Sequence, residues 1–446
     1  MPHLPTSRRF TPDGPLTGTI RVPGDKSISH RALMLGALCV GETRVTGLLE
    51  GEDVLATASA MRLMGADIRR ETRGDEAASE WVIHGVGVGG LLQPLQALDM
   101  GNSGTSTRLL MGLVSSHRIT ASFIGDNSLS RRPMNRVTEP LSQMGARFST
   151  SPGGTLPLMM EGACPAVPIT YRLPVASAQV KSAILLAGLN TPGITRVIEP
   201  IATRDHSERM LRGFGAQLDI GEEQGERVIA IHGEAELQPR TITVPGDPSS
   251  AAFFIVAALI VPGSELLIEN VGLNPTRAGI IHVLRDMGGH IEERNRRDVG
   301  GEPVADLLVR SSQLRGIEVD PAIAPSMIDE FPVLFVAAAL AEGRSVMRGI
   351  EELRVKESDR IAVMASALSI AGARIQETED GLIIDGTGGN PLAGSRQVIT
   401  THLDHRIAMS MAIAGLASKD GVEIDDTGPI RTSFPNFENL LTEAVS

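Results

Sequence analysis

The sequence predicts an α/β protein of two similar lobes, each built from three α/β units. A short motif occurs twice, as Val-Pro-Gly-Asp-Lys-Ser at residues 22–27 and as Val-Pro-Gly-Asp-Pro-Ser at residues 244–249. A glycine-centred helix-to-strand junction recurs every ~75 residues, as expected for repeated supersecondary units. Because only the first motif keeps a lysine, we expect a bilobed enzyme whose site lies between the lobes.

The two motif copies place the lobe boundaries. Each copy follows a short β-like run and opens an apolar helix. The first predicted strand, near residues 16–22, precedes the first copy, so we expect it to join the C-terminal lobe. The predicted lobes are therefore residues 1–22 with 246–446, and an inserted lobe at residues 23–245. Crossings near residues 22 and 245 would form a hinge.

The repeated junction explains the units within each lobe. Its glycine falls where a helix C-terminus needs left-handed backbone, and the apolar residue that follows restarts a strand. The five junction glycines are Gly65, Gly145, Gly215, Gly288 and Gly372. A second glycine opens a strand at Gly41, Gly193, Gly263, Gly343 and Gly421. The last precedes a helical stretch from Pro435, which predicts a truncated sixth unit.

Composition excludes several classes of protein. The chain of 446 residues has 41 basic and 53 acidic side chains, a net charge of −12, which argues against nucleic acid as a partner. The longest apolar run, residues 251–261, is too short to span a bilayer, and residues 1–10 lack the apolar core of a signal peptide. Two cysteines without metal-ligand spacing favour a reducing cytoplasm.

Clusters of polar residues precede apolar helices in the first half. In the first, at residues 26–31, we expect Ser27 to cap the helix and Lys26 and Arg31 to help bind an anion. The alternative is a capped helix with a solvated lysine and arginine. The segment lacks the glycines of a Walker P-loop.

Three further clusters of the first half have similar alternatives. Residues 101–108 form a small-residue turn that either approaches a ligand or is an ordinary polar turn. Arg131 and Arg132 either clamp a carboxylate or lie in a solvated loop. Residues 177–182 either bind a phosphate and a hydroxyl or form a serine cap with exposed Gln179 and Lys181.

The second half contributes three clusters. Asp329 precedes an apolar helix, as an N-cap or as a partly buried general base. Residues 353–360 alternate in charge, which is typical of a solvated helix face. His402 and His405 suggest a metal, but no third ligand accompanies them, so a capped helix carrying an anion-binding Arg406 is favoured. Several cations facing one cleft would repel one another unless a strongly anionic substrate pair filled it.

In its ordered motifs the chain resembles the family of 5-enolpyruvylshikimate-3-phosphate synthases over nearly its whole length. The motifs are Pro-Gly-Asp-Lys-Ser-x-Ser-x-Arg at 23–31, Gly-Asn-Ser-Gly-Thr at 101–105, Arg-Arg-Pro-Met at 131–134, Ser-Ala-Gln-Val-Lys at 177–181, Arg-Val-Lys-Glu-Ser-Asp-Arg at 354–360 and Asp-His-Arg at 404–406. Residues 177–179 and 203–206 resemble the bacterial class II branch. The resemblance implies two lobes of three βαβαββ repeats, an enolpyruvyl transferase-like inverse α/β barrel with its active site in the interlobe cleft.

The resemblance also implies the activity, that of a 3-phosphoshikimate 1-carboxyvinyltransferase (EC 2.5.1.19). The enolpyruvyl group of phosphoenolpyruvate passes to the 5-hydroxyl of shikimate 3-phosphate, and phosphate is released, on the way to chorismate and the aromatic amino acids. No metal or organic cofactor is implied. We expect a cytoplasmic monomer, a target of glyphosate, that binds these two small molecules and neither nucleic acid nor membrane.

Site residues are carried over from the family motifs. The implied substrate-binding residues are Lys26, Ser27, Arg31, Gly104, Arg132, Ser177, Ala178, Gln179, Asp329, Lys356, Arg360 and Arg406. Within this set, the residues at the phosphoenolpyruvate end are Lys26, Gly104, Arg132, Arg360 and Arg406. The implied catalytic residues are Lys26, Asp329 as base for the 5-hydroxyl, and Glu357 as proton donor to C3.

Three positions depart from the family pattern, and one of them, Arg204, stands near a position often held by tyrosine. Ala178 stands where many relatives have a second serine, so we expect only its backbone to contact phosphate. Gly104 is alanine in some class II relatives, and the missing methyl leaves room beside phosphoenolpyruvate. We therefore expect its analogue glyphosate to compete normally.

Two rival functions remain. The related UDP-N-acetylglucosamine enolpyruvyl transferase uses a loop cysteine, whereas we place Cys39 within the first helix and Cys164 in a proline-flanked stretch. A non-catalytic relative that binds phosphorylated metabolites would tolerate loss of Asp329 or Glu357, yet both are present.

Overall fold

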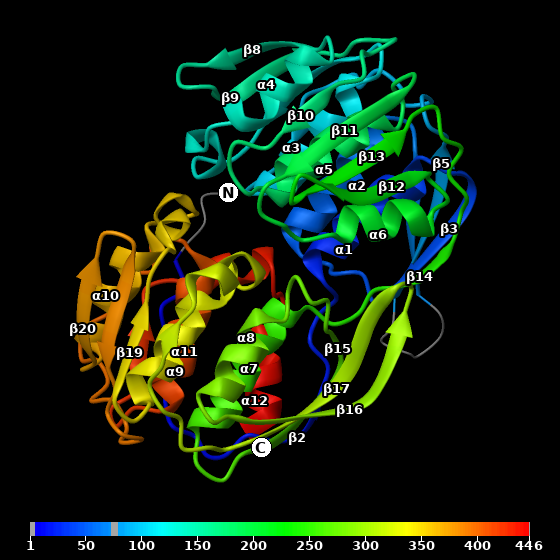
Figure 1. Ribbon diagram of the computed structural model, residues 1–446. Coiled ribbons are helices and arrows are strands. Elements are labelled where there is room, and N and C mark those ends of the chain that lie inside the picture. The colour runs from blue at the N-terminus through cyan, green and yellow to red at the C-terminus, as the bar shows by residue number, and fades with distance from the viewer. Residues whose placement is uncertain (1–4, 73–78, 446) are drawn as a thin grey trace. The chain divides into compact units, whose positions relative to one another are not determined.

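The computed structural model describes residues 5–72 and 79–445, and it divides into two compact units (Figure 1). The inserted unit is Gly24–Val244 with Val299–Gly301; the terminal unit is the chain up to Pro23, Pro245–Asp298 and the chain from Glu302 onward. Residues 1–4 of the predicted discontinuous lobe lie outside the described residues. That the units act as separate functional lobes stays a prediction.

The inserted unit contains three four-stranded sheets of one pattern. Their strand orders are β14-β3-β5-β4, β6-β7-β9-β8 and β10-β11-β13-β12. In each sheet one edge strand pairs in parallel and the other pairs are antiparallel. The strands are β3 (Val40–Thr46), β4 (Asp67–Thr72), β5 (Ser79–Val86), β6 (Leu98–Asp99), β7 (Thr120–Ile124), β8 (Arg147–Ser151), β9 (Thr155–Glu161), β10 (Thr170–Arg172), β11 (Ile194–Glu199), β12 (Leu218–Glu223), β13 (Glu226–His232) and β14 (Thr241–Thr243).

Two helices accompany each of these sheets. They are α1 (Lys26–Ala37), α2 (Glu52–Leu63), α3 (Gly104–Ser115), α4 (Asn135–Gln143), α5 (Ala178–Gly188) and α6 (His206–Gly213). The buried helices α1, α3 and α5 supply much of one continuous apolar core. The expected cap of α1 was wrong: Asp25 Oδ1 accepts from the amide of Ile28 at 2.9 Å, because Ser27 already lies inside the helix.

The terminal unit has two four-stranded sheets, β16-β17-β15-β2 and β18-β19-β21-β20, and the pair β1-β22. Its strands are β1 (Arg8–Phe10), β2 (Thr17–Ile20), β15 (Glu265–Gly272), β16 (His290–Val299), β17 (Glu302–Arg310), β18 (Glu318–Val319), β19 (Arg344–Met347), β20 (Arg374–Thr378), β21 (Gly381–Asp385) and β22 (Val422–Ile424). β2, the first predicted strand, pairs in parallel with β15. β1 pairs antiparallel with β22, which begins one residue after Gly421.

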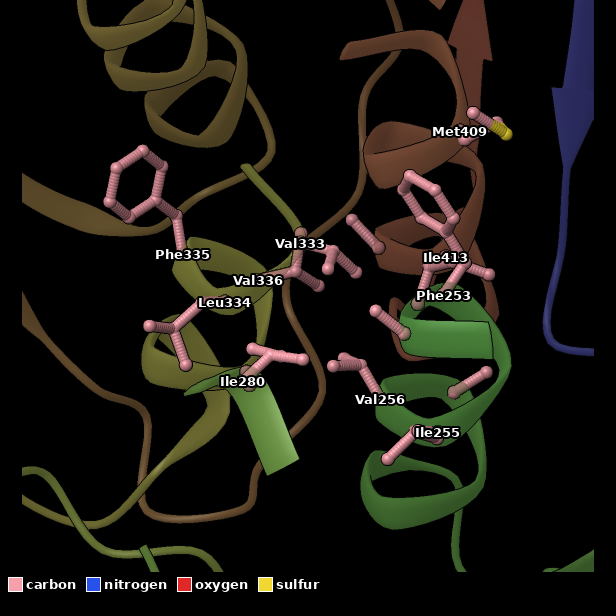
Figure 2. Close-up of a cluster of buried hydrophobic side chains, with 14 of the residues drawn as sticks. Phe253, Ile255, Val256, Ile280, Val333, Leu334, Phe335, Val336, Met409 and Ile413 are labelled. Carbon is pink, nitrogen blue, oxygen red and sulfur yellow. The ribbon is translucent and has the colours of Figure 1, made fainter. Parts of the chain in front are cut away.

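Three apolar helices form the centre of the terminal unit. The helices of this unit are α7 (Pro248–Ile260), α8 (Gly279–Asp286), α9 (Phe331–Leu340), α10 (Arg360–Ile370), α11 (His405–Leu416) and α12 (Phe437–Val445). Figure 2 shows Val256 of α7, Val333 of α9 and Ile413 of α11 among the side chains that meet there. α7 and α9 are apolar on every face because neighbours surround them.

The junction glycines adopt the conformation that the sequence predicts. Gly65 has φ of +104° and Gly372 has φ of +98°, and each follows a helix and precedes a strand. A side chain would be strained at these angles. Among the described residues, none of the helices has both the length and the apolar character needed to cross a membrane.

Candidate functional site

The N-termini of α1, α3 and α5 are linked in the inserted unit. Arg31 of α1 donates from Nη2 to Ser182 Oγ of α5 at 2.9 Å. Gln179 of α5 donates from Nε2 to Thr105 Oγ1 of α3 at 3.0 Å and accepts from Arg108 Nη1 at 2.8 Å. Helix N-termini carry unpaired amides and partial positive charge, so this arrangement suits an anion.

Lys26 and Arg31 differ in what holds them. Lys26 is part-buried and forms an ion pair with Asp53 at the start of α2. Arg31 is buried, donating from Nε to Ser207 Oγ at 2.8 Å and from Nη1 to the carbonyl oxygen of Ser27 at 2.9 Å. Arg31 thus fixes the first turn of α1, and with it the part-buried Ser27.

Gly104 and Arg132 are neighbours. Arg132 donates from Nη2 to Asn102 Oδ1 at 2.8 Å, just before α3 begins at Gly104. A methyl group added to Gly104 would lie 3.3 Å from Arg132 Nη1 and 2.9 Å from Arg108 Nη1. The size of residue 104 therefore controls the position of two guanidinium groups.

The first turn of α5 combines a cap with a buried charge cluster. Ser177 accepts from the amide of Val180 at 3.4 Å, and Ala178 and Gln179 follow in the first turn, both part-buried. The alternative of an exposed Lys181 was wrong: its side chain has no exposed area, and Nζ lies 3.0 Å from Glu199 Oε1 and 2.8 Å from Glu208 Oε1. Those carboxylates come from β11 and α6, and no sequence pattern indicates this pairing.

A buried polar chain joins the first three helices, and sequence reasoning missed it. Thr57 Oγ1 of α2 lies 2.8 Å from His30 Nδ1 of α1 and 2.6 Å from Ser106 Oγ of α3. Burial, and then the charges of Lys26 and Arg31, hold the pKa of His30 well below its usual value, so the imidazole is neutral. His30 lies inside the motif at 23–31 and Ser106 inside the polar cluster at 101–108, but Thr57 lies in neither.

Arg360 is the centre of the cluster in the terminal unit. Its side chain is 1% exposed, and it lies 3.4 Å from Asp329 Oδ1, 2.5 Å from Glu357 Oε2 and 2.8 Å from Asp404 Oδ2. Burial alone would lower the pKa of this guanidinium, but the carboxylates of Asp404, Glu357 and Asp329 raise it above its usual value. The expectation of a solvated charge run was therefore wrong for Arg360.

Asp329 and Lys356 lie beside this arginine. Lys356 Nζ is 4.0 Å from Asp329 Oδ1 and 2.5 Å from Glu352 Oε1. Asp329 lies in the 3₁₀ turn Ile328–Glu330 and does not cap α9, which begins at Phe331 without a side-chain cap. The helix-cap alternative is thus wrong, because the chain makes this extra turn before α9.

Arg406 opens α11. Asp404 caps that helix, accepting at Oδ1 from the Arg406 amide at 3.0 Å. Arg406 Nη1 donates to the backbone oxygen of Asp329 at 2.8 Å. Within residues 5–72 and 79–445, no group of three His, Cys, Asp or Glu side chains is placed to hold a metal ion.

Each unit thus supplies a different kind of chemistry. The inserted unit has helix N-termini and the cations Lys26 and Arg132, which suit phosphate and carboxylate groups. The terminal unit has two part-exposed carboxylates, Asp329 and Glu357, held by one buried guanidinium. Two carboxylates in one hydrogen-bonded cluster can remove one proton and deliver another.

Neither cysteine is placed for nucleophilic chemistry at these clusters. Cys39 lies just beyond α1, which ends at Ala37, so its predicted place within the helix was wrong. Burial raises the pKa of the Cys39 thiol to about 11, which keeps it protonated at neutral pH. Cys164 is exposed, and both thiols are free.

Comparison with known proteins gives one consistent result. The profile of the EPSP synthase (3-phosphoshikimate 1-carboxyvinyltransferase) family matches residues 10–441. The chain is 72% identical to the 3-phosphoshikimate 1-carboxyvinyltransferase of Novosphingobium aromaticivorans over 441 residues, covering 98% of this chain and 99% of that one. The Sphingopyxis alaskensis protein of the same name is 69% identical, with 98% of each chain covered.

A solved structure shows the same fold. The EPSP synthase from Acinetobacter baumannii superposes with a TM-score of 0.85 at 48% sequence identity, covering 98% of this chain and 97% of that one. That protein has the two-lobed inverse α/β barrel. The predicted fold class is therefore confirmed.

Proposed function

The chain belongs to the EPSP synthase family, and on this premise we propose how its side chains transfer an enolpyruvyl group. The reaction is that of a 3-phosphoshikimate 1-carboxyvinyltransferase (EC 2.5.1.19): the 5-hydroxyl of shikimate 3-phosphate attacks C2 of phosphoenolpyruvate, and phosphate leaves. The product lies on the shikimate pathway to chorismate and the aromatic amino acids.

Each substrate is bound by its own set of residues. Ser177, Ala178 and Gln179 receive shikimate 3-phosphate at the N-terminus of α5, where amides and hydroxyls face an anion. The other groups on that ligand are Ser27, Arg31 and Lys356. Those that hold phosphoenolpyruvate are Lys26, Gly104, Arg132, Arg360 and Arg406. Lys26 contacts both substrates.

Catalysis uses the two carboxylates of the terminal unit. Asp329 takes the proton of the 5-hydroxyl as its oxygen bonds to C2, and Glu357 delivers a proton to C3, which gives a tetrahedral intermediate. Glu357 then takes a proton back from C3 as the C2–O bond to phosphate breaks, and the carbon–carbon double bond is restored. Arg360, the shared partner of both carboxylates, holds them in place through contacts of 3.4 Å and 2.5 Å. As phosphate leaves, the cations stabilise its growing charge.

The observation that carries this proposal is the pairing of Asp329 and Glu357 on one buried guanidinium. The test is phosphate release by the purified protein supplied with both substrates. We expect Asp329→Ala and Glu357→Ala each to lower kcat by about 10²–10⁴-fold, the usual contribution of a general acid or base. Turnover like that of the unchanged protein in either variant would contradict the acid and base roles.

A parallel assay separates the related enolpyruvyl transferase. UDP-N-acetylglucosamine offered in place of shikimate 3-phosphate should yield no phosphate. Calorimetry with shikimate 3-phosphate and phosphoenolpyruvate should show turnover in addition to binding. A non-catalytic relative would show binding without turnover.

Finer assignments belong to the same proposal. The segments at residues 177–179 and 203–206 support a place in the bacterial class II branch. Two free cysteines support a cytoplasmic location. We expect a monomer, which light scattering will check, and two moving lobes at residues 1–22 with 246–446 and at 23–245.

A further inference from the structure

The second copy of the duplicated motif has no part in the proposed reaction, yet its polar side chains are buried. Asp247 caps α7, accepting at Oδ1 from the amide of Ser249 at 2.7 Å. Both side chains are shielded from solvent. Buried polar groups are costly unless they are paired, so their partners indicate their task.

The first partner is a buried arginine from the segment before α8. Arg277 Nη2 donates to Ser249 Oγ at 2.6 Å and lies 3.2 Å from Asp247 Oδ1. The Ser249 hydroxyl donates in turn to Glu330 Oε1. Glu330 is 2% exposed and immediately precedes the apolar helix α9.

The chain of contacts ends at two residues of the proposed site. Arg406 Nη1 lies 3.4 Å from Glu330 Oε1, and the same nitrogen donates to the backbone oxygen of Asp329 at 2.8 Å. The helices concerned are α7, α9 and α11, whose side chains interlock in the core (Figure 2). That packing brings their N-termini together.

We infer that Glu330, supported by Ser249 and Arg277, is a positioning residue that orients the Arg406 guanidinium toward phosphoenolpyruvate. This inference rests on the proposed function, in which Arg406 binds that substrate. A guanidinium is a planar, rigid fork, so a nitrogen held by Glu330 and the Asp329 carbonyl fixes the direction of the remaining donors. An arginine already held in one rotamer loses less conformational entropy when its ligand binds.

The buried carboxylate has a further property that fits this role. Glu330 Oε2 is buried and accepts no hydrogen bond from the described residues. The carboxylate is therefore held at Oε1, by the Ser249 hydroxyl and the Arg406 guanidinium. Removing one partner of a buried charge cluster also costs stability, so a selective change in substrate binding is what distinguishes a positioning role from a structural one.

The test is Glu330→Gln, which keeps the size and an oxygen for the Ser249 hydroxyl but removes the charge. Phosphate release is measured while each substrate is varied. We expect KM for phosphoenolpyruvate to rise about tenfold or more, the usual effect of losing a charge-assisted contact, while KM for shikimate 3-phosphate changes less than about twofold. In an Arg406→Lys background, Glu330→Gln should raise KM for phosphoenolpyruvate little further.

Glu302→Gln is the matched control. Glu302 is also a buried glutamate of the terminal unit, and its Oε2 accepts from Asn274 Nδ2 at 2.8 Å. We expect this variant to lose thermal stability without a selective rise in KM for phosphoenolpyruvate. A folded Glu330→Gln protein with an unchanged KM for phosphoenolpyruvate overturns the inference, and so does a Glu302→Gln control with the same rise in that KM. Either result leaves the proposed function standing. Absence of phosphate release by the unchanged protein would instead refute the proposed function, and the inference with it.

Discussion

Replacing Lys181 by methionine tests the buried charge cluster beneath α5. The change keeps most of the side-chain length but removes a charge that lies 3.0 Å from Glu199 and 2.8 Å from Glu208. Both glutamates are buried as completely as the lysine, so neither can recover its charge interaction from water. The remaining cation is Arg227, 3.4 Å from each carboxylate and partly exposed.

The expected loss of folding stability in Lys181→Met follows from the burial of the cluster. Removing one partner of a buried ion pair costs about 3–5 kcal/mol, and Arg227 places the expected loss near the lower limit, about 3 kcal/mol. That is a large part of the 5–15 kcal/mol that holds a typical domain folded. We expect the urea midpoint of the inserted unit to fall clearly, as measured by circular dichroism. We also expect KM for shikimate 3-phosphate to rise, because α5 carries Ser177 and Gln179.

Two further proteins make this result interpretable. Arg344→Met removes an exposed partner of Asp385 and should leave the urea midpoint unchanged. Adding Glu199→Gln and Glu208→Gln to Lys181→Met should restore much of the lost stability, because the uncompensated charges are gone. A Lys181→Met protein that unfolds at the original urea concentration would refute the reasoning.

Two other predictions follow from single contacts. Gly104→Ala should shift Arg108 and Arg132 by a few tenths of an ångström, since ordinary contacts are about 3.5–4.0 Å. In competition kinetics, the inhibition constant of glyphosate should then rise more than KM for phosphoenolpyruvate. Equal rises in these two constants would count against this. For His30, whose pKa is lowered below 6.5, the unfolded chain gains a proton first as the pH falls. The free energy of unfolding should therefore be steady above pH 6.5 and decline below it, and denaturation of His30→Gln should show a flatter profile.

The repeats and the start of each functional helix were predictable from local sequence. The junction glycines and the motifs before α1, α3, α5 and α11 act within a few residues, through backbone angles and helix ends. The family motifs likewise lie in short ordered segments. The errors there are small. The cap of α1 is Asp25, two residues before the expected Ser27.

The chain by itself therefore determined its units, its family and the residue types of its site. Only tertiary structure decided which charges are buried and what they contact. Lys181, Arg360 and Glu330 all stand next to polar or charged neighbours in sequence, yet each is buried against partners from distant segments. Burial depends on what packs over a side chain, and the packing of helices such as α7, α9 and α11 joins residues that no local pattern connects.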